Sequence, residues 1–121
     1  MKKHTARAIA YVAARLESGK TARHIYDYST SNHTSMSGTV TPSTVNVYDY
    51  DQSCHVGGSG SGGSFSLYHY GNSAHVSLKH ESKGNFSGYD YDTSSHFTAK
   101  VNGKSVSVYD YEHSSWTNFT V

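Results

Sequence analysis

Residues 85–103 read NFSGYDYDTSSHFTAKVNG, and they contain the pattern from which the fold can be inferred. Polar and apolar side chains alternate through residues 85–91 and again through residues 96–101. Alternation with a period of two is the pattern of a β-strand with one buried face. Asn102-Gly103 then stands before the next alternating run, and Asn-Gly in that place is typical of a type I′ hairpin turn. The stretch therefore predicts two antiparallel strands with short links on both sides.

The same pattern occurs five times along the chain. Tyr-Asp-Tyr begins at Tyr26, Tyr48, Tyr89 and Tyr109, and the variant Tyr-His-Tyr begins at Tyr68. Each motif is followed by a serine and then by a histidine or, once, tryptophan: Ser31, Ser53, Ser73, Ser94 and Ser114, then His33, His55, His75, His96 and Trp116. The motif recurs about every 20 residues, and a period of this length indicates one supersecondary unit that stacks on copies of itself.

We therefore predict an all-β fold and a single domain over residues 1–121. Residues 24–121 should form five β-hairpin repeats in an up-and-down antiparallel meander of about ten strands, which must roll into a barrel or fold over as a sandwich. The alternative is a β-solenoid with two strands per rung, since residues repeated at a fixed period can also stack in parallel. The short links favour the meander. The glycine-rich stretch 57–63 is expected to be a mobile loop or a poorly packed strand.

Residues 1–20 have the periodicity of a helix instead. Ile9, Val12 and Leu16 fall on one stripe, and Thr5 and Gly19 are suitable end residues for a helix over about residues 5–18. The opposite side carries Arg7, Tyr11, Arg15 and Ser18. This is the pattern of an amphipathic helix with one face in solvent. We expect it to cover an opening of the sheet or one of its faces.

Charge is distributed unevenly between the helix and the repeats. Residues 1–23 contain six basic residues and one acid, a balance of +5, whereas residues 24–121 contain four lysines and eight acids, a balance of −4. A basic arm on an acidic body can bind nucleic acid or a membrane surface. We favour the simpler interpretation, in which the helix docks on its own acidic body or on a neighbouring copy. The candidate basic residues are Lys2, Lys3, Arg7 and Arg15.

Several classes of protein are not supported by the sequence. Cys54 is the single cysteine, so an intrachain disulfide is impossible. The chain has no apolar run of membrane-spanning length and no secretory signal pattern, so we expect no membrane association and a cytoplasmic location. It also lacks a phosphate-binding glycine loop, a nucleophile elbow and a His-Glu-x-x-His motif. We expect no enzyme activity, no metal and no cofactor.

The tyrosines and recurring histidines are the strongest candidates for function. Alternation places them on one face of the sheet. The set is Tyr26, Tyr28, Tyr48, Tyr50, Tyr68, Tyr70, Tyr89, Tyr91, Tyr109, Tyr111, His33, His55, His75, His96 and Trp116. Cross-strand aromatic pairs stabilise a sheet. An exposed aromatic face also binds sugars, cations, bases or another copy of the chain.

An aspartate lies between the two tyrosines of four repeats, on the face that carries the apolar residues: Asp27, Asp49, Asp90 and Asp110. A buried carboxylate needs hydrogen-bond donors. Turn serines or turn amides are the expected donors, and an acidic ring at one rim would also receive the basic helix. The histidines, one per repeat, should lie about 10 Å apart along a meander, which is too far for shared metal ligation.

From these observations we predict a non-catalytic, small binding or self-assembling β-repeat protein that uses its Tyr/His-rich face. The expected partners are another copy of the chain, in a homo-oligomer, or a small ligand. One alternative is a nucleic-acid-associated protein with a basic N-terminal helix. A second alternative is a carbohydrate- or cation-binding aromatic platform. In a third, the sheet is an inert scaffold and only the helix contacts a partner.

Overall fold

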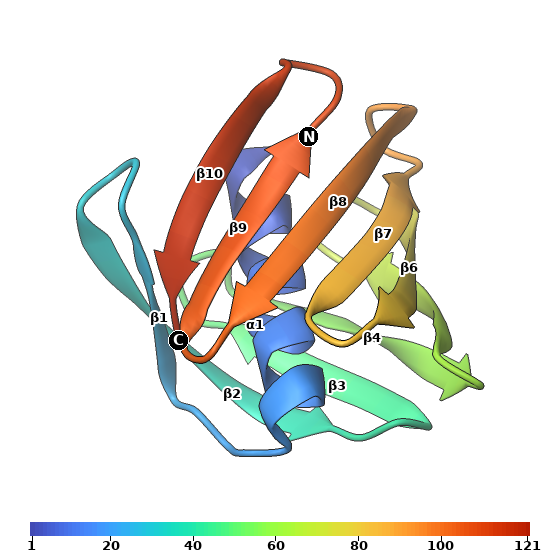
Figure 1. Cartoon of the computed structure of the whole chain (residues 1–121). Helices are drawn as coiled ribbons and strands as arrows, with labels where there is room; N and C mark the ends of the chain where they lie inside the picture. The colour runs from blue at the N-terminus through green and yellow to red at the C-terminus, as the bar shows by residue number, and fades with distance from the viewer.

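The computed structural model describes all 121 residues, which form one helix and ten strands. The strands make a closed barrel around the helix (Figure 1). The elements are α1 (Lys3–Ser18), β1 (His24–Asp27), β2 (Asn32–Val40), β3 (Thr44–Asp49), β4 (Cys54–Ser61), β5 (Ser64–His69), β6 (Ala74–Ser82), β7 (Asn85–Asp90), β8 (Ser95–Asn102), β9 (Ser105–Asp110) and β10 (Ser115–Thr120). No helix has the length and apolar character needed to cross a bilayer.

Every strand pairs antiparallel with its neighbours in sequence, and β1 pairs with β10 to close the barrel. The predicted meander and its rolling into a barrel are therefore confirmed, and the solenoid alternative is wrong. Closure joins Tyr26 to Thr120 and Asp27 to Phe119. The amide of Tyr28 also donates to the carbonyl oxygen of Asn118 at 3.1 Å. The other strand pairs are longer; β9 and β10, for example, are in register over six residue pairs.

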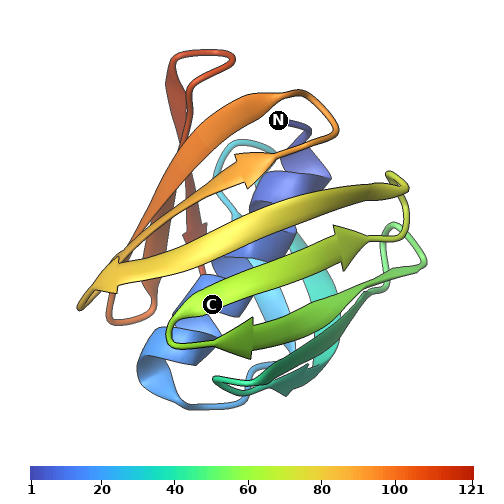
Figure 2. The ribbon, with the colours of Figure 1, turned by 90° about the vertical axis from the view of Figure 1, so that its right-hand side faces the viewer.

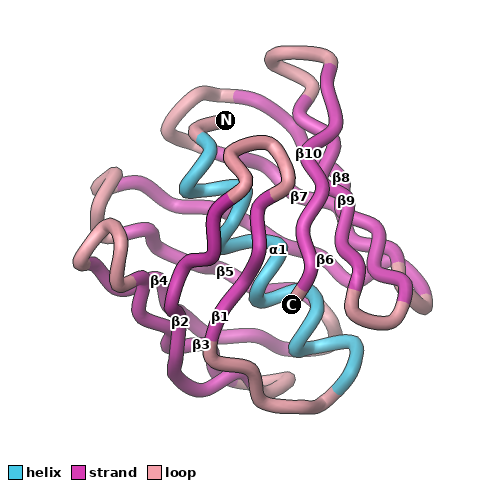
Figure 3. The backbone as a smooth tube through the Cα atoms, turned by 90° about the vertical axis from the view of Figure 1, so that its left-hand side faces the viewer, coloured by secondary structure: helices cyan, strands magenta, loops and turns pink.

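The helix lies inside the barrel, which corrects the prediction that it would cover an opening or a face of the sheet. Figures 1 and 2 show α1 with strands on both sides of it, and every residue from Thr5 to Arg15 is buried. Tyr11, on the side expected to face solvent, is 0 % exposed. The tube in Figure 3 shows the helix crossing the interior behind β1 and β2.

Small side chains let the helix fit there. Ala8, Ala10 and Ala13 are at most 1 % exposed, and they lie around the helix circumference rather than along one stripe. The inward residues of the strands pack against this helix in one cluster that contains Met36 and Leu67. An alanine-rich helix is narrow, and the interior of a ten-stranded barrel is wide enough to hold it. The helix therefore fills the centre of the hydrophobic core.

The helix differs from the prediction at its N-terminal end. It begins at Lys3 instead of Thr5, and no side chain caps its first turn. Thr5 is buried inside the helix, where its Oγ1 accepts a hydrogen bond from Asn72 Nδ2 at 2.7 Å. Gly19 ends the helix as expected, with φ of 69° and an amide that donates to the carbonyl of Arg15.

The recurring serine has a different role from the predicted one. Each of the five occupies the last position of its four-residue link with φ of 51–55°, the left-handed conformation. Hydrogen bonds to the aspartates come from other turn groups, such as the amide of Asp51, which donates to Asp49 Oδ1 at 2.9 Å. The serine thus reverses the chain direction, and the turn amides satisfy the buried carboxylates.

One further local prediction needs correction, and another is narrowed to one of its two alternatives. The hairpin after β8 has Gly103 and Lys104 as its loop residues, and positive φ occurs only at Gly103, the pattern of a type II′ turn instead of type I′. The type I′ pattern, with positive φ at both loop residues, occurs at Gly62 and Gly63. Of the two predicted states of the glycine-rich stretch 57–63, a mobile loop or a poorly packed strand, the structure shows a strand, because residues up to Ser61 belong to β4, which pairs on both sides.

Candidate functional site

The repeated aromatic residues form compact clusters on the outside of the barrel. In the second repeat, Tyr48 is at the centre. Its ring centroid lies 4.8 Å from that of Tyr50, two residues further along the same strand face, and 4.7 Å from that of His55, its direct partner on β4. Both contacts are edge-to-face, the arrangement that aromatic quadrupoles favour.

All five repeats build the same cluster. The tyrosine pairs are 4.8–4.9 Å apart, and the contacts to histidine or tryptophan span 4.6–5.0 Å. We call these the aromatic clusters: Tyr26, Tyr28 and His33; Tyr48, Tyr50 and His55; Tyr68, Tyr70 and His75; Tyr89, Tyr91 and His96; Tyr109, Tyr111 and Trp116. The structure thus brings the predicted residues together as five separate groups of three.

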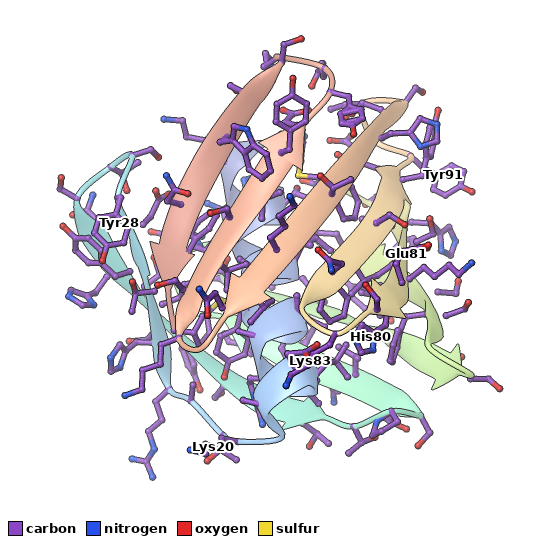
Figure 4. All side chains as sticks on the ribbon, viewed as in Figure 1. Lys20, Tyr28, His80, Glu81, Lys83 and Tyr91 are labelled. Atoms are coloured by element: carbon purple, nitrogen blue, oxygen red, sulfur yellow. The ribbon has the colours of Figure 1, made fainter.

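The two tyrosines of each cluster differ in exposure. The first is half-buried between its neighbours, whereas the second is 51–60 % exposed, and Trp116 is 49 % exposed. Tyr28 and Tyr91 project away from the barrel at opposite sides of the view in Figure 4. Two of the second tyrosines are anchored by their hydroxyls, Tyr28 to Thr120 Oγ1 at 2.9 Å and Tyr50 to Ser37 Oγ at 3.1 Å. These rings are accessible, yet they have defined positions.

The residue between the two tyrosines points inward and is buried in every repeat: Asp27, Asp49, His69, Asp90 and Asp110. We call these five residues the rim ring. An amide two residues further on donates to each carboxylate at 2.8–3.0 Å, and in the third repeat the amide of Asn72 donates to His69 Nδ1 at 3.3 Å. The turn amides therefore supply donors to all members of the rim ring.

The beginning of α1 meets this ring, as the interpretation of a helix docked on its own acidic body requires. Arg7 Nη2 lies 2.7 Å from Asp49 Oδ2, and both residues are buried. The ammonium group of Met1 lies 3.0 Å from Asp110 Oδ2 and also contacts Glu112. At the exposed surface, Lys2 Nζ lies 3.1 Å from Asp92 Oδ2.

The four predicted basic residues consequently do not form one surface. Lys2 and Lys3 are exposed, whereas Arg7 and Arg15 are 9 % and 5 % exposed. Arg15 Nη1 donates to the carbonyl of Gly38 at 2.7 Å and to the Tyr11 hydroxyl at 3.2 Å. The two arginines form their contacts inside the barrel, with groups of the same chain.

His69 stands where the other repeats have aspartate. It is 1 % exposed, its ring packs 5.0 Å from that of His4, and its Nε2 has no hydrogen-bond partner. Burial, reinforced by the nearby His4, lowers the pKa of His69 from 6.5 to about 4. The imidazole is therefore neutral at neutral pH.

This site predicts an acid-sensitive fold. The unfolded chain takes up the His69 proton near pH 6.5 and the folded chain only near pH 4, so unfolding becomes easier as the pH falls through this window. The loss should approach about 3 kcal/mol below pH 4. Urea denaturation between pH 7 and pH 4.5 measures it. The variant His69→Asn should lose less stability over the same range; an equal loss would show that another group is responsible.

Two other groups of reactive side chains lie at this end. Asp110, Glu112 and His113 place one ligand atom each within 4.8 Å of the others, a set that sequence analysis missed although all three lie close together in the chain. The Met1 ammonium already contacts both carboxylates of this set.

Cys54 lies beside Gly71, whereas His55 is exposed on the outside. Burial raises the pKa of the Cys54 thiol, which disfavours the reactive thiolate.

A groove of about 800 Å³ lies on the surface beside the fifth aromatic cluster. It is lined by Tyr109, Tyr111, Trp116, Lys100, Glu81, Asn85, Phe86, Ser87, Thr98, Ala99 and Ser114. A second depression of about 440 Å³ shares Ser87, Thr98 and Tyr111 with it and reaches Tyr89 and His96. We call the two together the Trp116 groove. Its charged residues were not among the predicted site residues, because Lys100 and Glu81 lie outside the repeated motif.

Comparisons with known proteins found no match. No protein-family model matches the chain, and neither does any curated protein or solved structure.

Proposed function

We propose that the protein is a non-catalytic binding module and that its aromatic clusters are the ligand-contacting surface. The observation that supports this most directly is the exposure of the second tyrosine in every cluster, 51–60 %, on rings that their neighbours hold in place. Rigid, accessible aromatic rings lose little entropy when a ligand packs on them. A closed barrel filled by a helix is a stiff support for such rings.

Self-association through the same surface is the second candidate. Six large aromatic side chains are about half exposed, and exposed aromatic surface of this kind is common at protein interfaces. Light scattering with and without about 0.5 M salt separates the candidates, since salt screens charge contacts but leaves aromatic contacts intact. A salt-resistant oligomer would place the clusters in a homo-oligomer interface. A monomer would leave them available to a ligand.

The nucleic-acid alternative loses much of its support. It required the basic helix to contact phosphates, but Arg7 and Arg15 are buried and hydrogen-bonded within the barrel. Stacking of bases on the tyrosines is the part of that hypothesis that is still available. The interpretation of the helix as a free partner-binding element loses its support for the same reason.

The binding proposal predicts that exposed tyrosines can be removed with little loss of stability. Replacing Tyr50 and Tyr91 by serine should cost less than about 1 kcal/mol per site, since these rings make mainly surface contacts. Binding should fall at least tenfold in a screen of neutral and acidic oligosaccharides, quaternary ammonium compounds and oligo(dT). Phenylalanine at the same positions keeps the ring and is the matched control. If serine substitutions at all five second tyrosines leave the binding affinity unchanged, the proposal is contradicted.

A further inference from the structure

The fifth aromatic cluster differs from the other four in its chemistry. Trp116 occupies the position that is histidine elsewhere, and it offers the largest ring on the surface. Lys100 Nζ lies 5.9 Å from the centroid of this ring, in a cation–π contact. A cation is thus held beside an apolar platform at this one cluster.

The positive charge of the repeats is also unevenly distributed along the chain. All four lysines of residues 24–121 follow β5, at Lys79, Lys83, Lys100 and Lys104. Lys79 and Lys100 line the two parts of the Trp116 groove. The comparable groove of the second repeat, about 550 Å³, is lined by Tyr48, Tyr50, His55, Asn46, Ser37, Gly38 and Thr39 and has no lysine. The two grooves share their aromatic geometry and differ in charge.

The remaining wall of the Trp116 groove is polar. Ser87 and Thr98 contribute hydroxyls, and Asn85 contributes an amide. Glu81 accepts a hydrogen bond from Ser87 Oγ at 3.0 Å and lies 3.7 Å from Lys79 Nζ. In Figure 4, Glu81 projects from the outside of the barrel. The groove therefore combines ring faces, neutral hydrogen-bonding groups, two ammonium groups and one carboxylate.

We propose that the Trp116 groove binds an acidic saccharide chain, an inference that rests on the proposed binding function. The C–H face of a pyranose ring is apolar and packs on Trp116 or Tyr111. Its hydroxyls can donate hydrogen bonds to Glu81. They can also form hydrogen bonds with the side chains of Ser87, Thr98 and Asn85. A carboxylate on the sugar pairs with Lys100 beside the platform.

A single-stranded nucleic acid fits these observations less well. Its phosphates would lie near Glu81, and the groove lining contains two lysines and no arginine. Strands of nucleic acid are usually bound in grooves that neutralise several phosphates. A saccharide uses the carboxylate and the hydroxyl groups of the wall as hydrogen-bond partners, so these groups favour the saccharide.

The test uses the full chain and three acidic probes, oligogalacturonate, oligoalginate and hyaluronan oligosaccharides, each paired with its methyl ester. Trp116 is the single tryptophan, so its fluorescence reports directly on the groove, and calorimetry gives the affinity. At least one acid form should bind and change the fluorescence. Its methyl ester, which lacks the charge, should bind about tenfold more weakly or worse.

Variants locate the effect. Lys100→Gln should weaken binding of the acid form about tenfold and remove its advantage over the ester. Trp116→His installs the residue of the other repeats and should abolish most binding, measured by calorimetry. Lys83→Gln, which removes an exposed lysine that does not line the groove, is the matched control and should leave the affinity unchanged.

Each contrary result has a distinct meaning. If none of the three acid forms binds, or if acid and ester bind equally, the acidic-saccharide inference is wrong. If substitutions at other tyrosines weaken binding but those at Lys100 and Trp116 do not, the Trp116 groove is not the binding site, although the proposed binding function stands. Tighter binding of oligo(dT) with steep salt dependence would replace the saccharide by nucleic acid. If no probe of the broader screen binds, the proposed function itself fails.

Discussion

A chain without residues 1–20 is expected to lose the barrel entirely. Ile9, Tyr11 and Val12 are at most 1 % exposed, and together with the alanines around them they form the centre of the core. Burying each large apolar side chain contributes about 1.5–3 kcal/mol, and the whole fold of a small protein is stable by only about 5–15 kcal/mol. The strands alone would surround an empty interior.

Far-ultraviolet circular dichroism and a thermal melt of residues 21–121 measure this effect. No cooperative transition is expected, and adding a peptide of residues 1–20 should restore one. A control chain with Lys2 and Lys3 changed to glutamine keeps the helix and should melt normally, since both side chains are exposed. A truncated chain that melts cooperatively would show that the sheet is an independent scaffold.

The second large effect is expected at the ion pair inside the rim. Replacing Arg7 by methionine leaves the carboxylate of Asp49, which is 0 % exposed, without its cationic partner. Such an isolated buried charge should reduce the free energy of unfolding by about 3–5 kcal/mol. The midpoint of urea denaturation is the measurement.

The double variant Arg7→Met, Asp49→Asn separates charge from packing. Asparagine keeps an oxygen that can accept from the amide of Asp51, as Asp49 Oδ1 does at 2.9 Å, and neither charge is left. Most of the lost stability should return. Lys2→Met is the control, because its pair with Asp92 is half exposed and should contribute less than about 1 kcal/mol. A double variant as unstable as the single one would assign the effect to packing.

The sequence predicted the sheet well because two independent signals agreed. The period of two identified which side chains point inward, and all five repeats gave the same answer, as in Val45 and Val47 against Tyr48 and Tyr50. The short links then restricted the chain to hairpins. Local rules of this kind need no knowledge of distant contacts.

The place of the helix could not be obtained in the same way. Arg7, Tyr11 and Arg15 indicated a solvent face, because charged residues are rarely buried without partners. Their partners are distant in sequence, at Asp49 and at the carbonyl of Gly38. One signal was present: alanines occur all around the helix, which indicates that it is surrounded on every side.

The candidate site was predicted in its composition but not in its differences. The alternation identified all fifteen aromatic and histidine positions on one face, and the structure places them outside the barrel. What distinguishes the fifth cluster is Lys100, which lies on β8 while Trp116 lies on β10. Lys100 and Trp116 come close together because of the pairing and curvature of the closed sheet. The spacing of residues in the sequence does not reveal this contact.

Closure of the barrel between β1 and β10 has a consequence for synthesis in the cell. Tyr26 pairs with Thr120, so the ring of strands cannot close until β10 has left the ribosome. The helix is made before all the strands and acquires its last wall only when β10 arrives. Contacts so distant in sequence slow folding, and unpaired strands are prone to aggregate in the meantime. The nascent chain therefore keeps an unpaired strand edge on β1 until β10 is in place.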